Sequence, residues 1–161
     1  MTRSLTTAIA ALLLSGCASA PQRQRETIPS VAGETLNKGG IQYVDIARGS
    51  GAAVTNGKCA YTHYTGWLTN GTRIDTSRDA EPVAFIQGTG KVMRGWEIGF
   101  DGMRAGAKRR LLIPYELAYG AAGNPPVVPA RSNLIFDVEL MAVTDATNHQ
   151  CRPWKEVSRS G

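Results

Sequence analysis

RGWEIGFDGM, residues 94–103, places large apolar side chains on one helical face although the segment contains three glycines. Met93, Trp96, Phe100 and Met103 follow the spacing of an amphipathic helix. Each interior glycine costs a helix about 1 kcal/mol relative to alanine. We therefore predict one short helix over residues 93–101 that depends on packing against other elements. Trp96 then either fills the core or forms a surface on which a ligand docks.

The segments on both sides of this helix have the composition of β-strands. Residues 58–68 are rich in aromatic and β-branched side chains, and alternation puts Ala60, Thr62 and Tyr64 on one face. Asn56-Gly57 and Asn70-Gly71 carry the strongest short-range signal for a hairpin turn. Further strands are predicted at residues 41–46, 73–75, 83–86, 109–113 and 134–143. The fold class is α+β, with a five- to six-stranded, mostly antiparallel sheet around one short α-helix.

The charge distribution argues against a nucleic-acid partner. The chain of 161 residues has a net charge of +5, but its basic residues are scattered. The one basic run, residues 108–110, leads directly into the apolar residues 111–113 and is typical of the solvated start of a strand. We predict no nucleic acid as a partner.

The usual signatures of covalent, metal-assisted or phosphate-binding chemistry are missing. His63 and His149 are the only histidines, and residues 88–91 lack the first glycine and the Ser or Thr of a phosphate loop. We predict no metal and no cofactor. Aromatic side chains remain, spread over separate elements, namely Tyr64, Phe85, Trp96, Tyr119 and Phe136. Each alone suits a core, but together they indicate an apolar ligand pocket.

The N-terminus has the pattern of an export signal. Arg3 precedes an apolar run that is too short to span a membrane, and residues 14–17, LSGC, resemble the lipobox of bacterial lipoproteins. This resemblance implies a signal peptide over residues 1–16 and a lipidated flexible tether over 17–35. Cys17 would be joined to diacylglycerol through a thioether and then N-acylated by a fatty acid such as palmitate. With Ala18 next, the resemblance also implies a bacterial cell-envelope protein anchored in the outer membrane and facing the periplasm or the surface. The alternative is an ordinary signal with a chance cysteine.

If Cys17 is lipidated, the other two cysteines form an even pair in an oxidising compartment. A disulfide between Cys59 and Cys151 would then tie the C-terminal tail, residues 144–161, to the domain. Such a link across a long loop contributes about 4 kcal/mol in the chain-entropy model. The sequence does not show whether the two Cα atoms approach closely enough. The tail itself is predicted to be irregular, packing back only if it is bridged.

Several motifs then resemble one family, the FKBP-type peptidyl-prolyl cis-trans isomerases. The motifs lie in that family's order and spacing over residues 36–143: His63-Tyr64-Thr65-Gly66, Asp75-Thr76-Ser77-Arg78, Arg94-Gly95-Trp96-Glu97, Tyr119-Gly120 and residues 134–140. The resemblance implies an isomerase domain in which a half-wrapped antiparallel sheet surrounds one short helix. It also implies proline-containing polypeptides as substrates and macrolide inhibitors as further ligands.

The resemblance assigns roles to individual residues. It implies that the proline ring lies on Trp96, that the Tyr119 hydroxyl and the Met93 N–H bond substrate carbonyls, and that Asp75 faces the substrate. The catalytic set is Tyr64, Asp75, Trp96, Tyr119 and Phe136. The substrate-binding set is Ile74, Val83, Phe85, Val92, Met93, Val127 and Val128.

Three positions depart from the family's best-known pattern. Ile74 and Val83 stand where many members have phenylalanine, and Asn124 replaces a histidine. The pocket is therefore expected to be roomier and less aromatic. Two functions follow: an isomerase for folding envelope proteins, or a lipid-anchored chaperone or host-interaction module with weak or incidental isomerase activity. Because the chain lacks the long helical N-terminal segment of dimeric relatives, we expect a monomer.

Overall fold

Two long strands form the centre of the sheet. In the computed structural model, which describes residues 25–159, β3 (Lys58–Leu68) has 11 residues and β7 (Leu134–Asp145) has 12. They pair antiparallel from Lys58 opposite Asp145 to Leu68 opposite Leu134, with a bulge between Tyr61 and Thr62. Their β-branched and aromatic side chains suit a pleated surface that is buried on one face.

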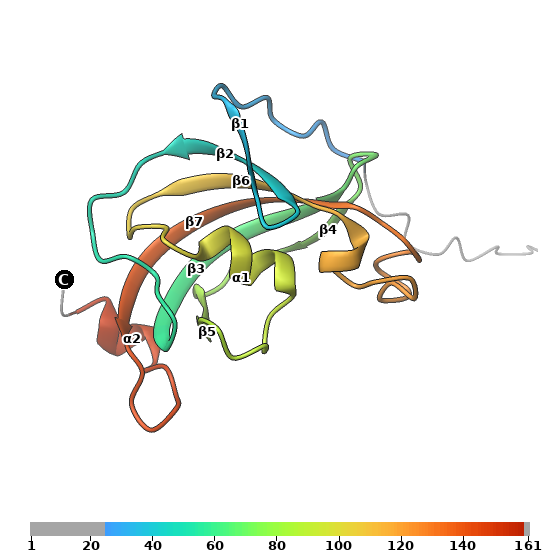
Figure 1. Cartoon of the computed structure of the whole chain (residues 1–161). Helices are drawn as coiled ribbons and strands as arrows, with labels where there is room; N and C mark the ends of the chain where they lie inside the picture. The colour runs from blue at the N-terminus through green and yellow to red at the C-terminus, as the bar shows by residue number, and fades with distance from the viewer. Residues whose placement is uncertain (1–24, 160–161) are drawn as a thin grey trace, which may run out of the picture.

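The other strands extend this pair into a curved antiparallel sheet with the order β1-β2-β6-β7-β3-β4, and β5 also pairs with β3 (Figure 1). The remaining elements are β1 (Thr35–Lys38), β2 (Ile41–Ala47), β4 (Arg73–Thr76), β5 (Val83–Ile86), α1 (Arg94–Phe100), β6 (Lys108–Ile113), the 3₁₀ turn η1 (Tyr115–Leu117) and α2 (Trp154–Val157). The predicted class and helix are confirmed. The strand count of five or six is wrong, because the sheet has seven strands.

The additional strand is β1, which pairs with β2 through a two-residue turn at Gly39 and Gly40. Both glycines have positive φ angles, 54° and 91°, as this kind of hairpin turn requires. Of the two Asn-Gly pairs, Asn70-Gly71 joins β3 to β4 in a hairpin. Asn56-Gly57 forms a turn before β3 in which the Lys58 N–H bonds the Thr55 carbonyl at 3.1 Å.

The helix α1 lies unusually close to the sheet because of its glycines. A Cβ atom added to Gly95 would lie 2.3 Å from Cγ2 of Ile113, and one added to Gly99 would lie 2.7 Å from Cδ2 of Leu111. Both partners are on β6 and are fully buried. The glycines therefore set the depth at which Trp96 and Phe100 enter the core.

Residues 25–34 lie against the face of the sheet opposite α1. The indole N–H of Trp67 donates to Glu26 at 3.2 Å, and Glu26 also pairs with Arg73. Arg110 donates to the Pro29 carbonyl at 2.6 Å. Residues 17–35 were predicted to be a flexible tether. In the described part of this segment, residues 25–35, these contacts attach the chain to the sheet. The predicted signal peptide, 1–16, and Cys17 lie outside the described residues.

The C-terminal tail packs on the same face and is tied down by a disulfide between Cys59 and Cys151, whose Cα atoms are 5.6 Å apart. The predicted pairing is thus confirmed. The bridge belongs to a small second core with Tyr61, Ile86 and Val157. The ring of Trp154 lies 5.7 Å from that of Tyr61. The tail is therefore not irregular throughout, because its packing residues form the short helix α2.

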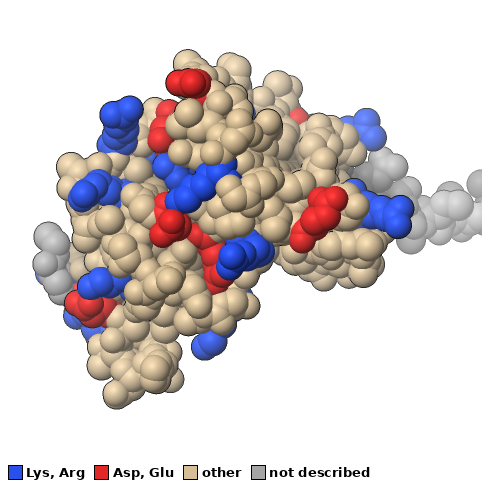
Figure 2. Space-filling model, viewed as in Figure 1, with Lys and Arg blue, Asp and Glu red and all other residues tan. Residues whose placement is uncertain are grey.

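The basic run at the start of β6 is neutralised by carboxylates. Lys108 pairs with Glu139 at 3.2 Å, and Arg109 and Arg110 pair with Asp45 and Asp137, each at 2.6 Å. On the face in Figure 2, basic and acidic side chains are interspersed. The run is therefore part of the sheet's ion pairs and forms no continuous basic surface there.

Candidate active site

Trp96 lies at the centre of a cluster of aromatic rings on the α1 side of the sheet. Its side chain is only 5% exposed. The ring centroids of Tyr64, Phe136, Phe100 and Phe85 lie 5.0, 5.4, 5.4 and 6.0 Å from it. These rings meet in tilted or edge-to-face orientations, which aromatic pairs prefer. The indole is therefore held in place by its neighbours.

A pocket of about 390 Å³ opens onto this ring, a size typical of ligand sites. Its lining consists of Tyr64, Ile74, Asp75, Val83, Lys91, Val92, Met93, Trp96, Ala118, Tyr119 and Phe136. The structure therefore brings together every residue of the predicted catalytic set. It adds four of the predicted substrate-binding residues, Ile74, Val83, Val92 and Met93.

The other three predicted substrate-binding residues do not line the pocket. Phe85 is buried behind Trp96, Val128 is 2% exposed, and Val127 packs against the core. They belong to the hydrophobic core that also contains Trp96 and Phe136. Sequence reasoning missed Lys91 and Ala118, although each directly precedes a residue that was predicted to line the pocket.

Asp75 and Tyr64 form a fixed polar pair at the edge of the pocket. The Tyr64 hydroxyl donates to Oδ2 of Asp75, and the Thr76 N–H donates to Oδ1 at 2.8 Å. Burial, and then the hydrogen bond to Asp75, hold the pKa of Tyr64 far above its ordinary value. Tyr64 therefore stays protonated, and its proton is committed to Asp75.

Tyr119 offers the pocket a donor that is not committed. Its side chain is 39% exposed, and its hydroxyl has no hydrogen-bond partner within residues 25–159. Burial raises its pKa, and the negative charge of Asp75 raises it further. The backbone N–H of Met93, at the N-terminus of α1, is likewise unpaired within the described chain. Two residues that line a mostly apolar pocket thus have uncommitted donors.

Residues 51–141 match a sequence model of the FKBP-type peptidyl-prolyl cis-trans isomerases. The chain belongs to this family. It is 46% identical over 106 residues to an FK506-binding protein of Neisseria meningitidis serogroup B, covering 65% of this chain and 97% of that one. The isomerase Fkbp12 of Drosophila melanogaster is 43% identical over 106 residues, covering 65% of this chain and 98% of the relative.

A solved peptidyl-prolyl isomerase structure from Pseudomonas syringae pv. tomato superposes with a TM-score of 0.63 at 30% identity. That likeness covers 69% of this chain and 81% of the other. The predicted family and fold class are thus confirmed, and the chain is a peptidyl-prolyl isomerase of the FKBP type. The part that matches the family includes all the residues that line the pocket.

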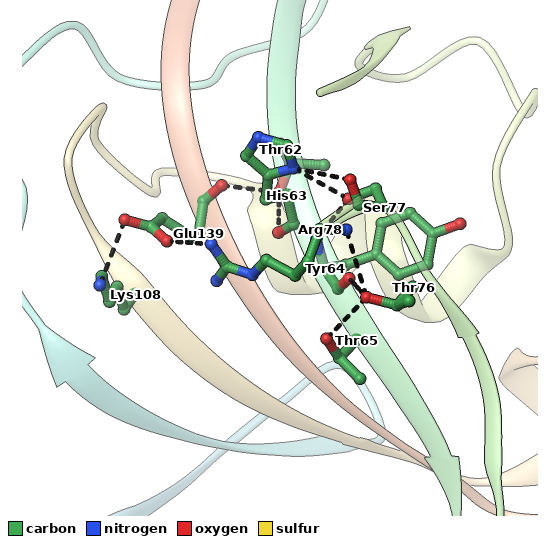
Figure 3. A network of polar contacts seen from close by, with 9 residues as sticks. All are labelled: Thr62, His63, Tyr64, Thr65, Thr76, Ser77, Arg78, Lys108 and Glu139. Carbon is green, nitrogen blue, oxygen red and sulfur yellow. Dashed lines mark hydrogen bonds and ion pairs between the residues drawn. The ribbon is translucent and has the colours of Figure 1, made fainter. Parts of the chain in front are cut away.

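In this isomerase, a polar network holds the segment that follows Asp75 against β3 (Figure 3). The Tyr64 N–H donates to Oγ of Ser77 at 2.9 Å, and Nδ1 of His63 lies 3.2 Å from the same oxygen. Oγ1 of Thr76 donates to the Tyr64 carbonyl at 3.0 Å. These bonds fix the backbone on both sides of the Tyr64–Asp75 pair, and they give His63 a structural position.

The same network continues to β7 and β6. Glu139 accepts from Arg78 at 2.6 Å and pairs with Lys108 at 3.2 Å. Burial alone would raise the pKa of Glu139, but the two cations outweigh burial and lower it. Within residues 25–159, no group of three or more His, Cys, Asp and Glu side chains is arranged to hold a metal ion.

Proposed function

We propose that the chain accelerates rotation about Xaa-Pro bonds by binding the twisted amide in the pocket above Trp96. The barrier is amide resonance, ~18–20 kcal/mol, and the uncatalysed reaction takes ~10–100 s. Reaching milliseconds means lowering the barrier by roughly 5–6 kcal/mol. A pocket achieves this by binding the transition state more tightly than the planar amide. The observation that carries the proposal is the free Tyr119 hydroxyl beside the aromatic floor.

The mechanism needs no nucleophile. A twisted amide has lost its resonance and part of its charge separation. The free-energy difference between the twisted and the planar amide is therefore smaller in an apolar pocket than in water. Trp96 holds the proline ring, while the Tyr119 hydroxyl and the Met93 N–H donate to the flanking carbonyls. Asp75 keeps the Tyr64 ring in place as a wall. Fixing the backbone on both sides favours the twisted geometry.

Tyr119→Phe is expected to lower kcat/KM for an Xaa-Pro peptide by about tenfold, because it removes one hydrogen bond worth about 1–1.5 kcal/mol. Asp75→Ala should also lower kcat/KM partially, because it releases the Tyr64 hydroxyl. A protease-coupled isomerisation assay measures both. Tyr115→Phe, a tyrosine of η1 outside the pocket, is the matched control. Complete loss of activity in either variant would instead indicate an acid–base step.

The rival function is a binding module for proline-containing segments. The aliphatic Ile74 and Val83 in the wall favour it, since they offer less aromatic contact to the proline ring of the twisted amide. Macrolide binding is part of both functions, because the relatives include proteins named for binding FK506. The coupled assay separates the two: if the purified wild-type protein gives no acceleration with any Xaa-Pro peptide, the binding module is the function.

We further propose that the isomerase acts on envelope proteins as an outer-membrane lipoprotein attached through Cys17. The disulfide supports export, because disulfides persist in oxidising compartments. No helix within residues 25–159 is long and apolar enough to cross a membrane. Because Cys17→Ser removes the proposed attachment site of the lipid, it should move the protein from the membrane fraction to the soluble fraction, as followed by immunoblotting of fractionated cells. A variant that still sediments with membranes would contradict the lipid anchor.

A further inference from the structure

The charged residues that line the pocket, Asp75 and Lys91, are in different situations. Asp75 accepts hydrogen bonds on both carboxylate oxygens, from Tyr64 and from the Thr76 N–H. Lys91 is exposed and has neither an ion pair nor a hydrogen bond within residues 25–159. The ammonium group of Lys91 is therefore the uncommitted charge at the mouth of the pocket.

The loop that carries Lys91 is anchored from below by α1. The carboxylate of Glu97, a residue that is 7% exposed, accepts the Gly90 N–H at 2.7 Å. The Gln87 side-chain amide donates to the Glu97 carbonyl at 2.7 Å, and the Thr89 hydroxyl donates to the Ile86 carbonyl at 2.8 Å. These bonds hold residues 86–90, which directly precede Lys91, to one another and to α1. The backbone of Lys91 is thus fixed beside Val92 and Met93, and its long side chain remains free.

We propose that Lys91 makes this isomerase prefer polypeptides with an acidic side chain next to the proline. This inference rests on the proposed function, in which the proline ring occupies the apolar floor. The side chain of a neighbouring residue then lies at the rim, within reach of a flexible lysine. Asp75 repels an acidic residue less than an uncompensated carboxylate would, because two donors already offset its charge.

The expected discrimination is modest because the contact is at an exposed rim. Solvent-exposed ion pairs contribute about 0.2–1 kcal/mol, which corresponds to a preference of about 1.4- to fivefold. Salt should weaken this preference, since the Debye length falls from about 10 Å at 0.1 M to about 3 Å at 1 M. The contact between the proline ring and the apolar floor does not depend on the charge of Lys91.

The test compares three peptides that differ only in the residue beside proline, which is glutamate, glutamine or lysine, on either side in turn. Isomerisation is measured without a coupling protease, so that peptide charge does not affect the readout. On at least one side of proline, wild-type kcat/KM should be about 1.4- to fivefold higher for glutamate than for glutamine, and lowest for lysine. Lys91→Glu should reverse this order. Lys155→Glu, at an exposed position on α2, should leave the order unchanged.

Two negative results have different meanings. Acceleration of all three peptides with equal kcat/KM, or an order that Lys91→Glu leaves intact, overturns the role of Lys91 while the isomerase function stands. No acceleration of any peptide by the wild-type protein overturns the proposed function, and this inference with it.

Discussion

Replacing Cys59 and Cys151 together with alanine is expected to lower the free energy of unfolding by about 4–5 kcal/mol. The disulfide closes a loop with a sequence separation of 92, and the chain-entropy model assigns a link of that length about this value. The melting temperature should fall by roughly 15 °C, since each kcal/mol shifts it by about 3–5 °C in a domain of this size. Thermal and urea unfolding followed by circular dichroism measure both quantities.

A reductant provides the control for the disulfide. Dithiothreitol should lower the melting temperature of the wild-type protein towards that of the double variant, and should leave the variant unchanged. Isomerase activity well below the transition should persist, because Cys59 faces the second core on the side of the sheet away from α1. If the free energy of unfolding falls by less than about 1 kcal/mol in the double variant, the disulfide contributes little to the stability of the domain in solution.

The strands and the helix were predictable because their sequence signals are local. Periodicity located α1 to within one residue at each end, and composition located β3 and β7. The strand β1 was missed because its four residues are too few for a visible alternation, although the Gly39-Gly40 dipeptide is itself a hairpin signal. The helix α2 depends on packing around a disulfide, which a local pattern does not contain.

The motifs were sufficient to predict which residues belong to the site. They did not show which of these residues line the pocket. The family resemblance placed Trp96 and Tyr119 in one pocket, and the structure brings them together. Sequence alone did not separate lining residues from other core residues, so Phe85 and Val128 were expected to face the ligand although neither lines the pocket. Lys91 was left out because the prediction was based on apolar and aromatic residues, and a lysine is neither.

Gly95→Val is expected to destabilise the protein by about 3 kcal/mol and to lower kcat/KM at least as much as Tyr119→Phe. A Cβ at this position would lie 2.3 Å from Cγ2 of Ile113, which is 1% exposed and branches next to its own backbone. Overpacking of this kind costs 1–3 kcal/mol or more. Valine is more favourable than glycine in a helix by only a few tenths of a kcal/mol, so little is regained there. Urea unfolding and the isomerase assay report the two effects.

The steric origin of the Gly95 effect is tested by removing the atom that is hit. Ile113→Ala alone should cost about 2–5 kcal/mol as a large-to-small core change. In an Ile113→Ala background, Gly95→Val should cost much less than in the wild type, because the space that the added methyl groups need is then empty. Equal costs in both backgrounds would mean that the glycine serves the helix and not its approach to β6. If the costs differ, Gly95 serves the close approach of α1 to β6, and Gly99 meets Leu111 of the same strand in the same way. A helix of poor intrinsic stability is held deep against the sheet, and the indole it carries is fixed at the height where a proline ring can rest on it.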